Sequence, residues 1–513
     1  MRNGFLSGSR GRVSGQVRAD ECLLSGERSS HNNEYLNQND VYAARVFKWA
    51  RDEFKESGIL QAKDESKTRN SSSESILKAL RTMLRVDSSG KSKESGLPRL
   101  RQRIHDQQNN VIKVCYVGGS ITEQKHGYRP ALQRFLSSIH GIGHDRTVEL
   151  HEIKASIGNV GSKVLNYLVD SWILDNDPDL VIIETAINDG DALIEDDDDT
   201  VNVRRAMEGI IRQIQQHIRK PDIIIVHMHL RVDVDCQRRT GTKAWTDNLV
   251  SYSVAESAYR SVLVSIYGSL SDHYSIPYVR VFDAFHSHRD DMLMDTLFRD
   301  DCHLTEHGGI VVAAIIGNSI LNALHHSEFS QTDKLCNSMA VKPYDSQFWH
   351  GGQAILATKT RQNVTLTFST PTGCPRHHHS RNDRDPLSGL PFRWTLLGVG
   401  DYLQVEFEGS SLALLTYSGP DSGMVHADIQ PLDDSANNKS CELHFHRQLF
   451  DKWSYYYRQT VCVLAESLPP KRYSAKVWID DGEVDKTITK RPTPKGVQGN
   501  RKLWLSYILI REN

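Results

Sequence analysis

Val111-Ile-Lys-Val-Cys-Tyr-Val117, followed at once by Gly118-Gly119-Ser120, is the stretch of sequence that decides the fold. The run is almost wholly apolar and rich in β-branched side chains, which is typical of a strand buried on both faces of a parallel sheet. The small residues after it predict a tight turn. We therefore expect Ser120 to lie just beyond the carboxyl end of a buried strand.

The same alternation of apolar strand and amphipathic helix continues along the chain to Leu324. Further strands are expected at Thr147–Ile153, Asp179–Ile183, Ile223–Met228 and Tyr278–Phe282. Helices are expected at Tyr128–Ile139, Val164–Ile173, Thr200–Arg219, Ala255–His273 and Ile310–Leu324. Repeated βα units with right-handed crossovers predict a three-layer α/β/α domain over residues 97–335, with a parallel sheet of about five strands.

The residues before and after this domain differ from it in composition and in hydrophobic periodicity. Residues 1–96 are expected to be largely disordered, with two short amphipathic helices, Val41–Glu56 and Ser75–Leu84. A mean hydropathy of −0.48 also indicates that part of the chain lies outside any core.

Beyond residue 340 the runs become short and alternating, which predicts an all-β sandwich over 340–513 that is docked on the α/β domain and assists substrate binding. The expected strands are Asn363–Phe368, Tyr402–Phe407, Ser411–Tyr417, Met424–Ile429, Ala475–Ile479 and Leu503–Ile510. Residues 376–390 are expected to form a loop of this domain.

Net charge and cysteine content limit the classes of partner and cofactor that we expect. The 513-residue chain has 62 Lys and Arg against 64 Asp and Glu, a net charge of −2, so charge gives no reason to expect nucleic acid. No signal peptide or membrane span is visible, so we expect a cytoplasmic protein by default, with the secretory pathway as the alternative. The eight cysteines include no C-x-x-C pair, and no metal or other cofactor is expected.

Polar residues that follow the predicted strands could carry acyl-transfer chemistry. A serine needs a base to act as a nucleophile, and the base needs an orienting group. In Asp300-x-x-His303 the acid can hold one imidazole nitrogen while the other faces Ser120. The backbone N–H groups of Ser120 and Gly158 and the side-chain amide of Asn188 could stabilise the oxyanion. Asp301 is a competing orienting acid, although its spacing from His303 fits less well.

Four short blocks, in order, resemble the SGNH or GDSL-type hydrolases, over about Leu97 to Leu324. They are Gly118-Gly119-Ser120-Ile121-Thr122, Ile157-Gly158-Asn159-Val160-Gly161, Ala186-Ile187-Asn188-Asp189 and Asp300-x-x-His303. The sequence departs from the family pattern at Gly119, where many members carry Asp, and at Ala186, where Gly is usual. The resemblance implies a nucleophile at Ser120, a base at His303, an orienting acid at Asp300, and an oxyanion hole made by Ser120, Gly158 and Asn188.

The function expected from this resemblance is that of a serine esterase or deacylase. The C-terminal domain loosely resembles the β-sandwich of some carbohydrate esterases, which favours an acyl group, such as O-acetyl, on a small-molecule or polysaccharide ester. The alternatives are an O-acyltransferase that uses the same site and a non-catalytic carbohydrate-binding protein. Two other conspicuous clusters, Glu195–Asp199 and His377–His379, are better explained as a solvated helix cap and a loop than as metal sites.

Overall fold

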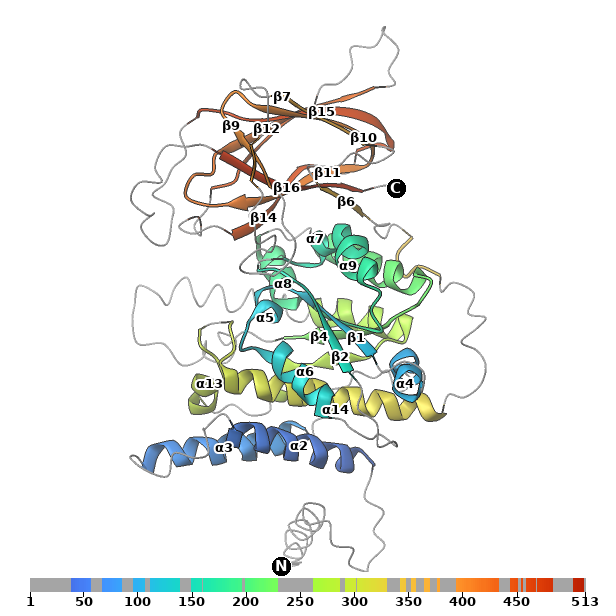
Figure 1. Cartoon of the computed structure of the whole chain (residues 1–513), viewed down its shortest axis with the longest axis vertical. Coiled ribbons are helices and arrows are strands. Elements are labelled where there is room, and N and C mark those ends of the chain that lie inside the picture. The colour runs from blue at the N-terminus through green and yellow to red at the C-terminus, as the bar shows by residue number, and fades with distance from the viewer. Residues whose placement is uncertain are drawn as a thin grey trace, which may run out of the picture.

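The computed structural model of the chain has an α/β part and a β part, stacked along its long axis (Figure 1). It describes residues 38–56, 67–84, 96–106, 111–138, 149–158, 160–195, 199–228, 262–286, 291–300, 302–329, 342–346, 352–356, 364–369, 376–378, 394–432, 443–450, 454, 458–466, 468–482 and 502–511.

Five parallel strands form the central sheet, in the order β2-β1-β3-β4-β5. Their bounds are β1 Val111–Gly118, β2 Glu149–Ser156, β3 Leu180–Glu184, β4 Asp222–His227 and β5 Tyr278–Arg280. The predicted parallel sheet is therefore confirmed. Because β1 lies between β2 and β3, the segments that follow these three strands emerge side by side at the carboxyl edge.

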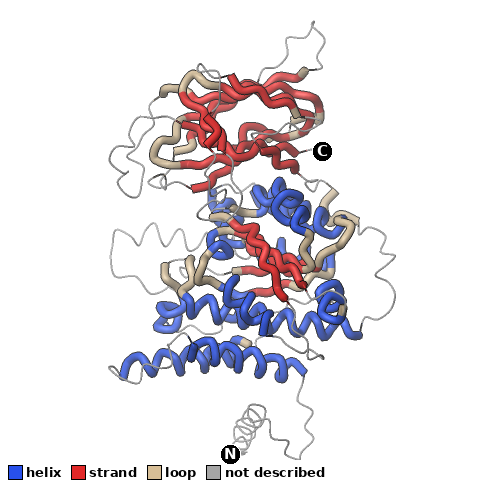
Figure 2. Tube along the Cα trace, viewed as in Figure 1, coloured by secondary structure: helices blue, strands red, loops and turns tan. Residues whose placement is uncertain are grey.

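Side chains of β1 alternate between the two faces of the sheet and so define two core layers. Val114 and Tyr116 are buried in one apolar cluster, whereas Cys115 and Val117 are buried in the other. The first layer contains α4 Pro98–His105, α6 Tyr128–Ser138, α12 Val281–His286, α13 Asp291–Leu297 and α14 Glu306–Phe329. The second contains α7 Ser162–Leu168, α9 Asp199–Gln216 and a helix over residues 262–274. Figure 2 shows the red strands between the blue helical layers.

Two helices near the N-terminus cover the outer side of the first layer. They are α2 Gln38–Glu56 and α3 Lys67–Met83, and they lie against α14 and α13 in Figure 1. Phe54 and Leu80 are buried in the same cluster as Val114 of the sheet. The two short helices were predicted from their apolar spacing, but their burial in the α/β core was not, because periodicity does not identify the surface that a helix covers. Most of the segment Met1–Asp40 lies outside the described residues.

One stretch of α14, Glu306–Leu324, is apolar and long enough to cross a bilayer, judged by length and composition alone. From the sequence, a helix was predicted at Ile310–Leu324 and no membrane span. In the structure 89% of this stretch is buried, and Val312, Ile316 and Ile320 belong to the core of the α/β part. Its apolar composition is that of a helix at the centre of a protein core.

The C-terminal part contains two antiparallel sheets that face each other across one core, as expected for a β-sandwich. One sheet has the order β13-β12-β15-β10-β7, with β7 Thr365–Ser369, β10 Tyr402–Gly409, β12 Met424–Pro431, β13 Leu443–Gln448 and β15 Lys471–Ile479. The other has the order β14-β11-β16-β9-β8, with β6 also paired to β16; its strands are β6 Gly352–Leu356, β8 Arg376–His378, β9 Trp394–Gly398, β11 Ser411–Ser418, β14 Arg458–Ala465 and β16 Lys502–Arg511. The expected loop at 376–390 is wrong at its start, because β8 pairs with β9.

The second sheet of the sandwich packs directly on the α/β part. Leu415 of β11 and Leu509 of β16 are fully buried in the same cluster as Leu165 and Leu168 of α7. The hydroxyl of Tyr167 in α7 lies 2.7 Å from Ser411 Oγ at this junction. The sandwich is thus docked through a shared apolar core. The domain limits at residues 97, 335 and 340 stay predictions.

Candidate active site

Ser120 is placed by the turn between β1 and the short helix α5, Ser120–Glu123. Gly119 precedes the helix and sits against the side chain of Asn188, in the first turn of α8 Ala186–Glu195. A Cβ atom at Gly119 would lie 1.9 Å from Asn188 Oδ1, so no larger residue fits without moving the amide. The glycine therefore lets the first and third sequence blocks meet beside Ser120.

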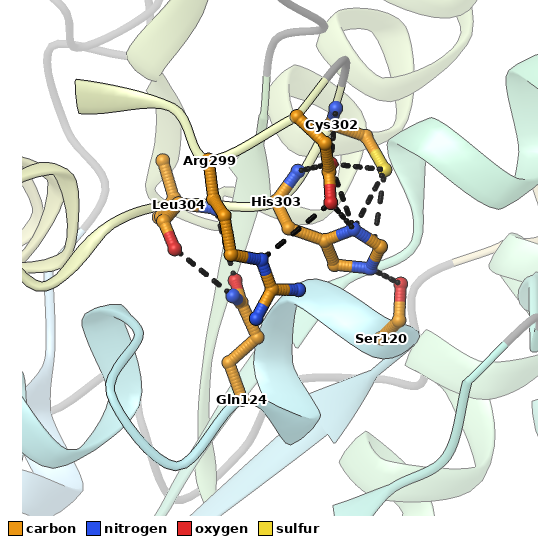
Figure 3. A network of polar contacts seen from close by, with 7 residues as sticks. Ser120, Gln124, Arg299, Cys302, His303 and Leu304 are labelled. Carbon is orange, nitrogen blue, oxygen red and sulfur yellow. Dashed lines mark hydrogen bonds and ion pairs between the residues drawn. The ribbon is translucent and has the colours of Figure 1, made fainter. Parts of the chain in front are cut away.

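His303 reaches Ser120 from a loop before α14, 183 residues away in the sequence (Figure 3). His303 Nε2 lies 3.0 Å from Ser120 Oγ, and His303 Nδ1 lies 2.9 and 3.0 Å from the two carboxylate oxygens of Asp300. An ionised carboxylate only accepts hydrogen bonds, so the imidazole proton belongs on Nδ1 and Nε2 is left to accept from the serine hydroxyl. This is the arrangement that a serine nucleophile requires.

Asp300 is fixed by the backbone of the same loop. Its Oδ1 accepts the backbone N–H of His303 at 2.7 Å and that of Cys302 at 3.1 Å. Partial burial raises the pKa of this carboxyl. The two backbone N–H groups and the imidazole together lower the pKa by more than burial raises it, so the net pKa lies below the ordinary value. The side chain is 46% exposed, so solvent screens its charge. Asp301, the competing acid, lies outside the described residues.

The predicted oxyanion donors gather near Ser120, but one of them is already engaged. Gly158 follows β2, and a Cβ atom there would lie 3.7 Å from Ser120 Cβ. Its backbone N–H donates to Glu123 Oε2 at 2.7 Å. Glu123 Oε1 in turn lies 3.8 Å from Lys154 Nζ. A carboxylate from α5 therefore occupies the N–H that an oxyanion would need.

Asp189 ties the second and third sequence blocks together behind the site. Its Oδ1 accepts the backbone N–H of Ser162 at 2.7 Å and lies 3.0 Å from Ser162 Oγ. Its Oδ2 accepts from the hydroxyl of Tyr267 at 2.5 Å. Burial raises the pKa of Asp189, and the bonds from Tyr267 and Ser162 oppose that shift. This network fixes α8, which carries Asn188, against α7.

Gln124 links the nucleophile segment to the histidine loop. Its Nε2 donates to the carbonyl oxygen of Leu304 at 3.0 Å, and its Oε1 accepts the Leu304 backbone N–H at 3.1 Å. Figure 3 shows this pair of bonds to the left of the His303 ring. Because Gln124 directly follows α5 and Leu304 follows His303, the pair of bonds sets the separation of serine and imidazole. Gln124 is a positioning residue in this arrangement.

A second buried carboxyl lies under the nucleophile turn. Glu184, the last residue of β3, is 1% exposed, and its Oε2 accepts from Thr122 Oγ1 at 3.4 Å. Thr122 Oγ1 also lies 2.9 Å from the hydroxyl of Tyr128. Burial raises the pKa of Glu184 to about 8, with a further upward contribution from Asp189, so this carboxyl is protonated at neutral pH.

Other conspicuous residues lie outside this arrangement. His227 is buried and its Nδ1 lies 2.6 Å from the hydroxyl of Tyr278, so this histidine has a structural role. His307 stacks on Phe54 because α2 covers α14 there, and burial lowers the pKa of His307. Of the two clusters doubted as metal sites, His377 and His378 lie in β8, and residues 196–198 of the acidic run lie outside the described part of the chain.

Comparison with known proteins agrees with this geometry. Residues 116–309 match the model of the GDSL-like lipase/acylhydrolase family. The chain carries a GDSL-like lipase/acylhydrolase domain. This family domain makes the protein a carboxylic ester hydrolase, and the SGNH resemblance of the four blocks is confirmed. No curated protein matches the sequence.

One solved structure has a similar fold over most of the chain. A two-domain esterase (CEX) active on acetylated mannans, co-crystallised with mannopentaose, aligns with a TM-score of 0.55 at 16% identity, over 83% of this chain and 97% of that one. The lipase/acylhydrolase from Enterococcus faecalis aligns over 41% of this chain and 95% of its own, with a TM-score of 0.30 and 16% identity. At such identities the first of these similarities shows the fold alone: a GDSL-like domain followed by a β domain.

Proposed function

We propose that this GDSL-like hydrolase is a serine esterase that removes short acyl groups, acetyl in particular, from carbohydrate, with Ser120 as nucleophile, His303 as base and Asp300 as the orienting acid. The observation that carries the proposal is the contact of His303 Nε2 with Ser120 Oγ at 3.0 Å while Nδ1 faces Asp300 at 2.9 Å. Nε2 faces the serine whose proton it accepts, and Nδ1 faces the acid that stabilises the imidazolium, as proton transfer requires.

The reaction follows from these contacts. Ser120 Oγ attacks the ester carbonyl as its proton moves to His303 Nε2, and Asp300 stabilises the imidazolium that forms. The backbone N–H groups of Ser120 and Gly158 and the Asn188 amide would stabilise the oxyanion, which requires Glu123 to release Gly158. His303 then protonates the departing alcohol, and a water activated by the same imidazole hydrolyses the acyl-enzyme.

The proposed carbohydrate substrate has its support in the shared two-domain fold. The mannan esterase that aligns over most of both chains is described as acting on acetylated mannans. In the present protein the β-sandwich is fused to the α/β part through a common core, so it is held in a fixed position relative to the α/β part. The sandwich would assist binding of an extended substrate without supplying the nucleophile or the base.

The test compares purified wild-type protein with Ser120→Ala on p-nitrophenyl esters of increasing acyl length and on acetylated oligosaccharides. We expect acetate release from the oligosaccharides, fastest turnover with the shortest aryl esters, and loss of both activities in Ser120→Ala without a change in thermal stability. Hydrolysis by Ser120→Ala at the wild-type rate would refute the proposal. Transfer of the acyl group to an added sugar, in preference to water, would instead assign the protein as an acyltransferase.

A further inference from the structure

Cys302 places a thiol beside the two residues that we propose as base and orienting acid. Its Sγ lies 3.3 Å from His303 Nδ1 and 3.7 Å from Asp300 Oδ1. Figure 3 shows the sulfur beside the imidazole, on the side away from Ser120. One potential ligand atom from each of Asp300, Cys302 and His303 lies within 4.8 Å of the others. Within the described part of the chain, this is the only such group of three.

The separations of these atoms are close to those of a tetrahedral zinc centre. With metal–ligand distances of about 2.3 Å to sulfur and 2.0–2.1 Å to nitrogen and oxygen, neighbouring ligand atoms lie about 3.3–3.6 Å apart. The observed separations are 3.3 Å for Sγ to Nδ1, 3.7 Å for Sγ to Oδ1 and 2.9 Å for Nδ1 to Oδ1. Side-chain shifts of about half an ångström would therefore complete three corners of the tetrahedron.

We propose that Asp300, Cys302 and His303 form an inhibitory binding site for a thiophilic divalent cation, Zn²⁺ being the ion whose ligand preferences fit best. A thiolate, an imidazole nitrogen and a carboxylate oxygen are all ligands that Zn²⁺ takes in proteins. Water supplies the fourth ligand, because the Asp300 side chain is 46% exposed and the loop opens to solvent.

The electrostatic surroundings set the strength of this site. Arg299 Nε lies 3.6 Å from Asp300 Oδ2, and its guanidinium opposes a cation. The Arg299 side chain is 65% exposed, so solvent screens this repulsion. The thiolate and the carboxylate together supply two negative charges to a doubly charged ion. Because the ligand charges balance the charge of the ion while Arg299 opposes it, we expect Zn²⁺ to bind reversibly and not as a permanent structural ion.

Inhibition follows from where the imidazole proton goes, and this part of the inference rests on the proposed function. An ion on Nδ1 uses the lone pair of that nitrogen, so the single ring proton moves to Nε2. The Cys302 thiol loses its proton to solvent, so one proton is released for each ion bound. Nε2 then presents an N–H group to Ser120 and has no lone pair with which to accept the serine proton. The ion also takes Asp300 away from its orienting role.

The first measurement is binding, which needs no esterase activity. Titration of the metal-free full-length protein with Co²⁺ should give the near-ultraviolet charge-transfer absorbance of a cobalt–thiolate bond, and Zn²⁺ should displace it. Cys302→Ser should lose this absorbance, whereas Cys462→Ser, which removes a buried thiol of β14, should keep it. An equal cobalt–thiolate absorbance in Cys302→Ser, or none in the wild type, would overturn the site.

The second measurement is inhibition of p-nitrophenyl acetate hydrolysis by Zn²⁺ at fixed free concentrations. Wild type and Cys462→Ser should lose activity reversibly, with recovery on chelation. Cys302→Ser, measured against its own metal-free kcat/KM, should require at least about tenfold more Zn²⁺ for half inhibition. Identical inhibition of wild type and Cys302→Ser would refute the proposal. A cobalt–thiolate signal in a protein without esterase activity would overturn the proposed function and leave the metal site standing.

Discussion

The hydrogen bond from the Gly158 backbone N–H to the Glu123 carboxylate leads to a specific kinetic prediction. A hydrogen bond from an N–H group to a charged acceptor contributes about 1.5–3 kcal/mol, and the observed 2.7 Å separation is typical of such a bond. An oxyanion can use Gly158 only after this bond breaks. Because water and Lys154, 3.8 Å away, can take up the released carboxylate, we expect a cost at the lower end of that range.

Glu123→Ala should therefore raise kcat/KM for a small aryl acetate by about tenfold, the rate equivalent of about 1.4 kcal/mol. Glu123→Gln keeps a neutral acceptor, so its increase should be smaller. The matched control is Glu149→Ala, which removes an exposed carboxylate at the start of β2 and should leave kcat/KM unchanged. A fall in kcat/KM for Glu123→Ala, with unchanged thermal stability, would show that Glu123 supports the oxyanion hole and would refute this reasoning.

Three further predictions follow from the same network. Asn188→Ala should lower kcat by about 10²–10³ with a smaller effect on KM; an effect on KM alone would assign Asn188 to ground-state binding. Gln124→Ala should lower kcat by up to about thirtyfold, because two bonds to Leu304 of about 1 kcal/mol each no longer hold the histidine loop; an unchanged kcat would remove its positioning role. The pKa of Glu184 is about 8 in the folded protein and has its ordinary value in the unfolded chain, so the folded state holds an extra proton between about pH 5 and 8. The stability of the wild type should therefore fall relative to that of Glu184→Gln as the pH rises through this range. Melting temperatures that change in parallel for the two proteins would contradict this.

Much of the α/β part could be predicted from the sequence because its strands are continuous apolar runs. Leu180–Glu184 is buried at every residue, and such a stretch is recognisable without knowledge of its neighbours. The placement of Ser120, Gly158 and Asn188 at the carboxyl edge of the sheet could be predicted because each follows one of these strands, where parallel sheets place their ligand sites. The order of the four blocks then identified the histidine loop.

The residues that sequence analysis missed act through contacts between distant segments. Glu123 lies 35 residues from Gly158, and Gln124 lies 180 residues from Leu304, so no local pattern connects them. Strand β13 was missed because most of its residues are exposed and only Leu443 and Phe445 are apolar. Strand β14 was missed because Cys462 faces the sandwich core while Val461 packs toward the α/β part, which removes the alternation.

The central claim is that Ser120 is the nucleophile and that His303 activates it. The most direct test is mass spectrometry of the full-length protein after reaction with a fluorophosphonate, followed by mapping of the labelled peptide. The account predicts a single adduct on Ser120, no adduct in Ser120→Ala, and sharply slower labelling in His303→Ala. An adduct on another residue, or labelling of His303→Ala at the wild-type rate, would contradict it.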